Sequence, residues 1–170
     1  YITRSCMILL TTVLIILFFC IMLLVGQIQG TARVVNYAGL VRGKTQRIIK
    51  LENAGQPHDE MIESVSSYIK GLRYGSDELK LVRLDDAAFQ VKMNELNRYF
   101  EKLCKEILLI REKGYENTNI IEMSETFFNI CDEATGLAEA YSQRKATALN
   151  RLEQIVFVDI GGLIIIIAIE

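Results

Sequence analysis

The sequence of 170 residues contains one proline, one histidine and no tryptophan. Because proline ends or kinks most helices, its near absence favours long, uninterrupted helices. A chain of this length holds one ordinary domain, which excludes a large multidomain enzyme. The single histidine, His58, follows Pro57 in a predicted surface turn without convergent partners. We interpret it as a solvated turn residue and not as a metal ligand or a general base.

The sequence also lacks the short motifs that carry catalysis or nucleotide binding. HExxH, GxSxG, Walker-type loops and CxxC are all missing. No nucleophile, base and oxyanion donor can be assembled from what remains. We therefore predict that this chain is not itself an enzyme and binds no metal or cofactor.

Near each end of the chain lies a long run of residues with almost no charged side chains. Residues 6–25 contain no charged side chain, and residues 155–169 contain only Asp159. Twenty apolar residues in a helix span about 30 Å, the thickness of a bilayer's hydrocarbon core. We predict transmembrane helices at residues 6–25 and 155–170, the second cut short where the sequence ends. A signal peptide is the alternative for the first run, although residues 26–30 make a poor cleavage site.

Two spans place both ends of the chain on one side of a membrane. Arg4, in the short stub of residues 1–5, favours the cytoplasm for that side. Residues 26–154 then form an extracytoplasmic domain. Asp159 is expected to reach headgroup water or to pair the spans of two subunits, because a carboxyl group in a span is costly. The adjacent Gly161 and Gly162 permit close helix approach.

Between the spans, apolar residues recur every three or four positions, as in helices that bury one face. Asn119 followed by Glu122 resembles a capping box at the start of the last helix. Residues 77–84 read either as a last helical turn or as a packed connector. The simplest fold is all-α, a membrane-anchored antiparallel four-helix bundle between two transmembrane helices. Its helices are expected at about Thr31–Lys50, Asp59–Arg73, Asp85–Lys113 and from Asn119 into the second span.

Four cysteines do not form a disulfide framework here. Cys6 and Cys20 lie in the first span, where thiols behave as small apolar side chains. Cys104 and Cys131 fall at similar heights if the third and fourth helices form a hairpin. A disulfide between them is an alternative outside the cell, and buried free thiols are our main interpretation.

One segment differs in charge from the rest of the domain. Residues 33–50 contain five basic side chains and no acidic one. On a helix Gly39, Arg42 and Gln46 share one face, with Asn36 and Gly43 on the neighbouring stripe. Glycine within a helix costs about 1 kcal/mol relative to alanine, so two glycines indicate close approach to the backbone. The structural alternative is that the arginines pair with acidic residues of adjacent helices and the glycines only allow tight packing.

The segment from Asn36 to Arg47, NYAGLVRGKTQR, resembles the N-x-A-G-x-x-R-x-x-x-Q-R signature of PilJ-type and nitrate/nitrite-sensor-type receptors. The resemblance implies a dimeric four-helix bundle between two spans of a bacterial inner or plasma membrane, which binds a small anion at the dimer interface. Arg42 matches the anion-binding arginine, and Gly43 and Lys44 depart from the bulkier residues usual there. The implied ligand residues are Arg42, Gly39, Ala38, Asn36, Gln46 and Arg47.

These observations predict that the chain is the input domain of a transmembrane signalling receptor and that it works as a homodimer. We do not expect it to bind nucleic acid. Two Arg42 side chains across a two-fold axis would hold one nitrate-like anion, whereas an Arg42 locked onto a carboxylate of its own chain would leave no such site. The expected output domain beyond residue 170 is a kinase, a chemoreceptor tail or a nucleotide cyclase. The alternatives are a scaffold for an envelope protein, or a sensor of an organic ligand such as an amino acid.

Overall fold

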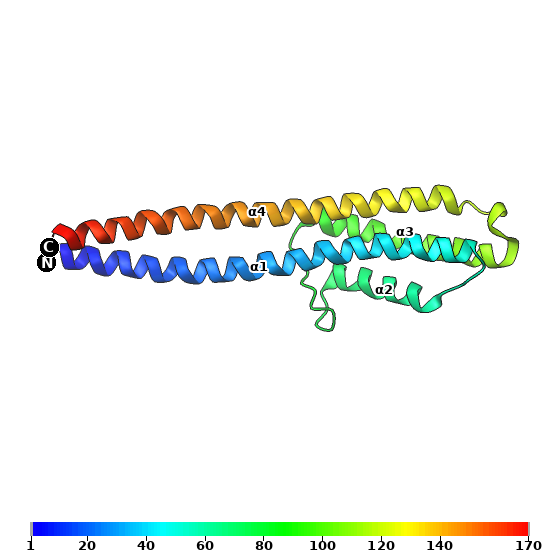
Figure 1. Ribbon diagram of the computed structural model, residues 1–170, viewed down its shortest axis with the longest axis horizontal. Coiled ribbons are helices and arrows are strands. Elements are labelled where there is room, and N and C mark those ends of the chain that lie inside the picture. Colours follow the sequence, from blue (N-terminus) through cyan, green and yellow to red (C-terminus); the bar gives the residue numbers. More distant parts are fainter. Residues whose placement is uncertain (1, 170) are drawn as a thin grey trace. The chain divides into compact units, whose positions relative to one another are not determined.

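A computed structural model describes residues 2–169 of the chain, and these residues are almost entirely helical (Figure 1). The only pairing of strand type in this range is an isolated bridge between Ser76 and Leu81. The all-α prediction is therefore confirmed. The helices are α1 (Ile2–Asn53), α2 (Asp59–Tyr74), α3 (Ala87–Lys113) and α4 (Ile120–Ile169), with a 3-10 turn at Tyr115–Asn117.

The chain divides into two compact units. Residues 30–141 form a core unit, and residues 2–29 and 142–169 form a terminal unit. Helices α1 and α4 each contribute to both units, since neither is interrupted within its bounds. Residues 26–29 and 142–154, which we predicted within the extracytoplasmic domain, belong to the terminal unit in this division, and the predicted bounds of that domain stay a prediction.

The core unit is held together by apolar side chains from all four helices and from the connector between α2 and α3. Leu81 and Leu84 of the connector are buried, which settles the ambiguous residues 77–84 as a packed connector. In α3 every apolar residue of the predicted periodic face is buried. These residues are Phe89, Met93, Leu96, Phe100, Leu103, Ile107 and Ile110.

The helix ends are set by glycines with positive φ angles and by a capping side chain near in sequence, except at the start of α4. Gly55, Gly75 and Gly114 have positive φ angles of 69°, 85° and 81°, a conformation that glycine adopts without strain. Asp86 caps α3 by accepting a 2.8 Å hydrogen bond from the backbone N–H of Phe89. The capping box predicted at the start of α4, in which Glu122 accepts a hydrogen bond from the Asn119 N–H, is wrong. The Asn119 N–H donates to the Glu106 carboxylate of α3 at 2.7 Å, because α3 lies within reach at that turn.

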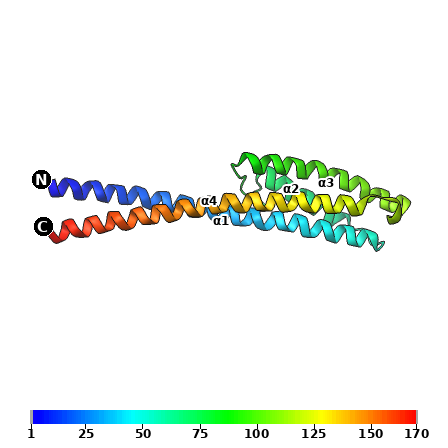
Figure 2. The ribbon, with the colours of Figure 1, turned by 90° about the horizontal axis from the view of Figure 1, so that it is seen from above.

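The terminal unit contains the two apolar runs. Helices α1 and α4 are each long and apolar enough to cross a membrane. In the most apolar 18-residue stretch of α1 no residue is buried, and in that of α4 only 6% of the residues are buried. The core helices of soluble proteins are, by contrast, mostly buried. Within this unit the two segments run alongside each other (Figures 1 and 2), with Leu10 of α1 close to Gly162 of α4.

Candidate functional site

Helix α1 presents a polar stripe on the outside of the core unit. Asn36, Gly43, Gln46 and Arg47 are exposed on it, and Gly39 is half-buried. Arg47 makes no hydrogen bond or ion pair within residues 2–169, so its guanidinium is available to a ligand. Five of the six predicted ligand residues therefore lie on this stripe or, for Arg42, beside it.

The sixth predicted residue, Ala38, lies elsewhere. It is buried in the apolar core together with Val34 and Val41 of the same helix face. Its methyl group therefore packs inside the unit, away from a ligand on the outer stripe.

The two glycines of the stripe are not needed for packing within the chain. A Cβ atom added at Gly39 or Gly43 would meet no atom within 4 Å. Since each glycine costs about 1 kcal/mol of helix stability, tight packing inside this chain does not explain them. That half of the structural alternative is therefore not supported.

Arg42 lies at the edge of the stripe that faces α4. Its Nη1 donates to Asp132 Oδ1 at 2.5 Å, and its guanidinium carbon lies 5.1 Å from the ring centre of Phe128. The other half of the structural alternative is thus observed: Arg42 is paired with a carboxylate of its own chain, the arrangement that we expected to leave no anion site unless the carboxylate is displaced. The two side chains are 35% and 60% exposed, and exposed ion pairs contribute only about 0–1 kcal/mol. A competing anion can therefore displace this carboxylate at small cost.

Charge is segregated between α1 and α4 in the core unit. Residues 31–50 of α1 carry five basic side chains and no acidic one, whereas residues 120–141 of α4 carry five acidic side chains and no basic one. One of the five, Lys44, is turned away from the stripe. It donates to Ser64 of α2 at 3.0 Å, and the Ser64 and Lys44 hydrogen bonds lower the pKa of Tyr68.

A buried carboxylate that the sequence did not reveal lies where α1 ends. Glu52, whose side chain is 2% exposed, accepts two hydrogen bonds from Arg111 of α3, at 3.0 and 2.6 Å. Arg111 also donates to Asp59 at 2.6 Å, and this hydrogen bond lowers the pKa of Asp59. The cluster joins α1, α2 and α3, and all of its charges are paired, so we assign it a structural role.

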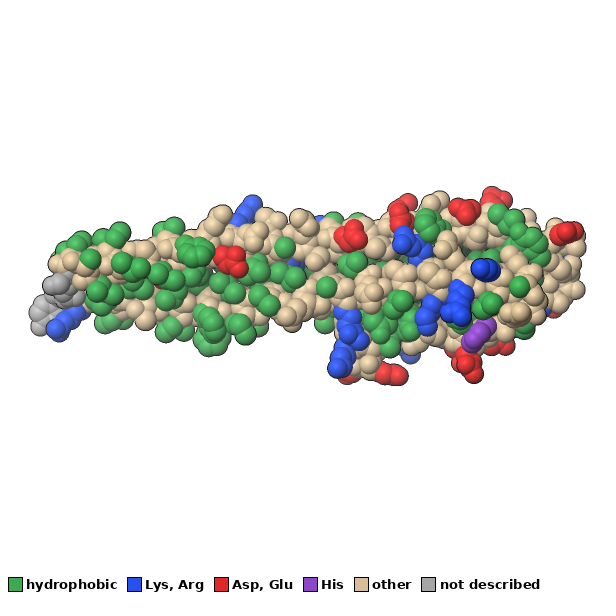
Figure 3. Space-filling model, viewed as in Figure 1, with side chains coloured by type: hydrophobic (Ala, Val, Ile, Leu, Met, Phe, Trp, Pro, Cys, Tyr) green, Lys and Arg blue, Asp and Glu red, His purple; other side chains and the backbone are tan. Residues whose placement is uncertain are grey.

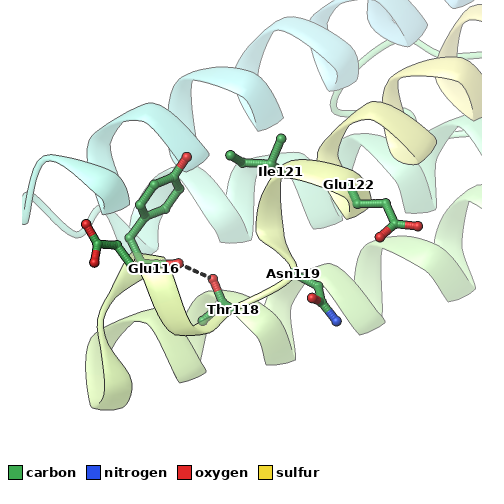
Figure 4. A pocket seen from close by; sticks show the side chains of 6 residues that line it. Glu116, Thr118, Asn119, Ile121 and Glu122 are labelled. Atoms are coloured by element: carbon green, nitrogen blue, oxygen red, sulfur yellow. Dashed lines mark hydrogen bonds between the residues drawn. The ribbon is translucent and has the colours of Figure 1, made fainter.

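A shallow hollow of about 320 Å³ lies at the turn between α3 and α4 (Figure 4). Two carboxylates, Glu116 and Glu122, line it, and Thr118 is held there by a 2.8 Å hydrogen bond to the Tyr115 carbonyl. No basic side chain lines this hollow. It therefore does not suit an anion.

The cysteines of the core unit are free thiols in the structure, Cys131 buried and Cys104 half-buried. Burial raises the pKa of Cys131 to about 12 and that of Cys104 to about 11. Because the thiolate is the reactive form, we expect maleimide to modify neither thiol in the folded chain at pH 7.5 and both after denaturation. Mass spectrometry without reductant measures this. A disulfide-linked peptide pair, or rapid labelling of the folded chain, would contradict it.

Asp159 is the polar exception in the terminal unit. It is buried, and its Oδ2 has no hydrogen-bond partner. The carboxyl group thus faces into the unit, and both expectations for Asp159 stay predictions. Within residues 2–169 no group of three or more metal-binding side chains gathers here or elsewhere.

Comparisons with protein-family models, with curated proteins and with solved structures find no match. The resemblance of residues 36–47 to the sensor signature therefore remains a prediction.

Proposed function

We propose that this chain is the input domain of a transmembrane receptor, a homodimer that binds a small nitrate-like anion. In this proposal residues 26–154 form an extracytoplasmic antiparallel four-helix bundle, and the ends of α1 and α4 cross the membrane. The observation that carries it is the outer stripe of α1, where two glycines face open space beside exposed basic and amide side chains.

A second copy of the chain is the partner that best fits this stripe. Gly39 and Gly43 allow a helix to approach the backbone closely, and most homo-oligomers are two-fold symmetric dimers.

The proposed anion binds Arg42 by displacing the Asp132 carboxylate. In the single chain Arg42 is paired with Asp132, so the anion must take the place of this carboxylate. A guanidinium holds a planar oxyanion with two parallel hydrogen bonds, and a second Arg42 from the partner doubles the attraction. The ligand then stabilises the dimer packing in which the two arginines face each other, by its differential affinity for that state.

Signal transfer requires helices that run from the site into the membrane. Helix α1 extends from Ile2 to Asn53 and α4 from Ile120 to Ile169 without interruption. A change in packing near Arg42 or Asp132 is therefore applied to the same helices that carry the apolar runs. Small shifts and rotations of helices are a known means of such switching.

Cross-linking tests the dimer. In a variant whose Cys6 and Cys20 are replaced by alanine, we expect Gly43→Cys to form a disulfide-linked dimer in membranes, with a yield that nitrate alters. The matched control, Lys102→Cys on the exposed side of α3, should remain monomeric. A monomeric Gly43→Cys variant would contradict the proposed interface.

A thermal-shift screen with nitrate, nitrite, phosphate and amino acids identifies the ligand class. We expect nitrate and nitrite to raise the melting temperature of the core unit. A shift with amino acids alone would support an organic ligand, and no shift with any of them would support the protein scaffold.

A further inference from the structure

A second shallow hollow, of about 380 Å³, lies on the surface of the core unit where α2 meets α3. Arg73 lines it from the last turn of α2, and the other lining residues come from adjacent turns of α3. These are Val91, Asn94, Asn97 and Arg98. We call this site the α2–α3 hollow, and all of its residues belong to the core unit. Since ligand pockets commonly have volumes of about 300–1,000 Å³, it has the size of a site for a small organic molecule.

The guanidinium of Arg73 is held in place by neutral neighbours. Its Nε and Nη2 donate to Asn94 Oδ1 at 3.1 and 2.9 Å, and its Cζ lies 4.8 Å from the centre of the Tyr74 ring. Neither neighbour carries a negative charge, so the positive charge of Arg73 is not neutralised. A guanidinium has five N–H donors, and three of those of Arg73 make no hydrogen bond within residues 2–169.

Arg98 adds a second positive charge to the same hollow. It is exposed, and it makes no hydrogen bond or ion pair within the part of the chain that the structure describes. It lies four positions after Asn94, about one helical turn further along α3. Arginines from two neighbouring helices therefore line one hollow, and both have donors left for a ligand.

Among residues 2–169 no acidic side chain lines the hollow to balance these charges. The Glu101 carboxylate accepts a 2.8 Å hydrogen bond from Asn97 Nδ2, but it lies outside the lining. Elsewhere on the core unit, basic and acidic side chains lie beside each other at several places (Figure 3), and Arg42, Lys92 and Arg111 are each paired. The α2–α3 hollow is thus a site of uncompensated positive charge, which attracts anions.

The other lining residues favour an organic anion with two carboxylates. A guanidinium binds a carboxylate with two parallel hydrogen bonds, so each arginine can hold one carboxylate. Val91 is 68% exposed and offers an apolar surface for a short carbon chain. The Nδ2 of Asn94 has no hydrogen-bond partner among the described residues and can donate to the ligand. An amino acid also carries an ammonium group, and this lining offers it no carboxylate.

We propose that the α2–α3 hollow binds a small organic dicarboxylate, with one carboxylate on Arg73, the other on Arg98, and the carbon chain against Val91. The site is separate from the stripe of α1, and it does not rest on the anion proposed there. Because a ligand that binds only the folded state stabilises it, the dicarboxylate raises the stability of the core unit as its concentration exceeds its dissociation constant.

Calorimetric titration of the detergent-solubilised full chain with succinate tests the proposal. We expect Arg73→Ala and Arg98→Ala each to weaken succinate binding at least tenfold, with unchanged helical circular dichroism. Arg73→Lys keeps the charge but lacks the planar fork, so its affinity should lie between those of Arg73→Ala and the unaltered chain. The control, Lys105→Ala, removes an exposed charge of α3 outside the hollow and should leave the affinity unchanged.

Three further ligands test which chemistry the hollow selects. Propionate lacks one of the two carboxylates of succinate, and aspartate adds an ammonium group to it. Both should bind at least tenfold more weakly than succinate. Inorganic phosphate tests for an unselective anion site, and phosphate binding as tight as that of succinate would overturn the dicarboxylate assignment.

Two other outcomes would overturn the proposal. The first is no heat of binding at millimolar succinate, or an Arg98→Ala variant that binds succinate like the unaltered chain. The second is a loss of succinate binding in Arg42→Ala with none in Arg73→Ala, which would place the dicarboxylate on the stripe of α1. Nitrate binding is measured in separate titrations, so failure of this site and failure of the proposed function are distinguishable.

Discussion

Replacing Arg42 with alanine is expected to remove nitrate and nitrite binding while the helical circular dichroism stays unchanged. A hydrogen bond to a charged group contributes about 1.5–3 kcal/mol, so each lost arginine weakens binding roughly tenfold to a hundredfold. The fold should tolerate the change, because the Arg42–Asp132 pair is exposed. Isothermal titration calorimetry measures the loss. Arg83→Ala, an exposed arginine of the connector between α2 and α3, is the matched control, and equal binding by both variants would place the site elsewhere.

A substitution of Asp132, the ion-pair partner of Arg42, is expected to raise the affinity for the anion and not to lower it. If Asp132 competes with the anion for Arg42, Asp132→Asn should tighten binding by up to about fivefold, since an exposed pair contributes at most about 1 kcal/mol. Glu133→Gln, next in sequence and paired with Lys92 instead, should leave the affinity unchanged. Weaker binding by Asp132→Asn would show that Asp132 positions the arginine and does not compete for it.

The second large effect is expected at Arg111, as a loss of stability. Arg111→Ala leaves the Glu52 carboxylate buried without its partner, and breaking a buried pair costs about 3–5 kcal/mol. We expect about 3 kcal/mol here, because Arg111 itself is partly exposed to water. Urea unfolding in detergent, followed by circular dichroism, measures the change. Arg111→Met with Glu52→Leu should recover most of the stability, since the double variant removes both charges.

Asp59 is the control within the same cluster. It is 72% exposed, so Asp59→Asn should destabilise the fold far less than Arg111→Ala. Its lowered pKa means that its contribution is complete above the ordinary value of 3.8 and is lost as the pH falls through the lowered value. Asp59→Asn should therefore reduce the acid sensitivity of unfolding below pH 4. An equal loss for both variants at pH 7 would contradict the central role of Glu52.

The helices could be predicted from the sequence because their signals are local. A three-to-four spacing places Phe89, Met93 and Leu96 on one side of α3, and the structure buries all three. Glycine at Gly55 and Gly114 marks helix ends through the conformation that it alone adopts freely. The same periodicity did not show that Ala38 faces the core while Gly39 faces outward, since the two residues are adjacent.

The contacts at the candidate site could not be predicted because they join residues far apart in sequence. Arg42 and Asp132 are 90 positions apart, and Glu52 and Arg111 are 59 apart. Periodicity assigns each residue to a face of its own helix, but the partner depends on how the helices pack. The capping partner at the start of α4 was predicted wrongly for the same reason. The backbone N–H of Asn119 donates to the Glu106 carboxylate of α3 and not to the carboxylate of Glu122.

The stoichiometry of nitrate tests the central claim most directly. Calorimetry on the detergent-solubilised full chain, with sedimentation to determine its oligomeric state, should give one nitrate for every two chains in a dimer. One nitrate per chain would place the site within a single subunit, and no heat of binding at millimolar nitrate would contradict the anion sensor altogether.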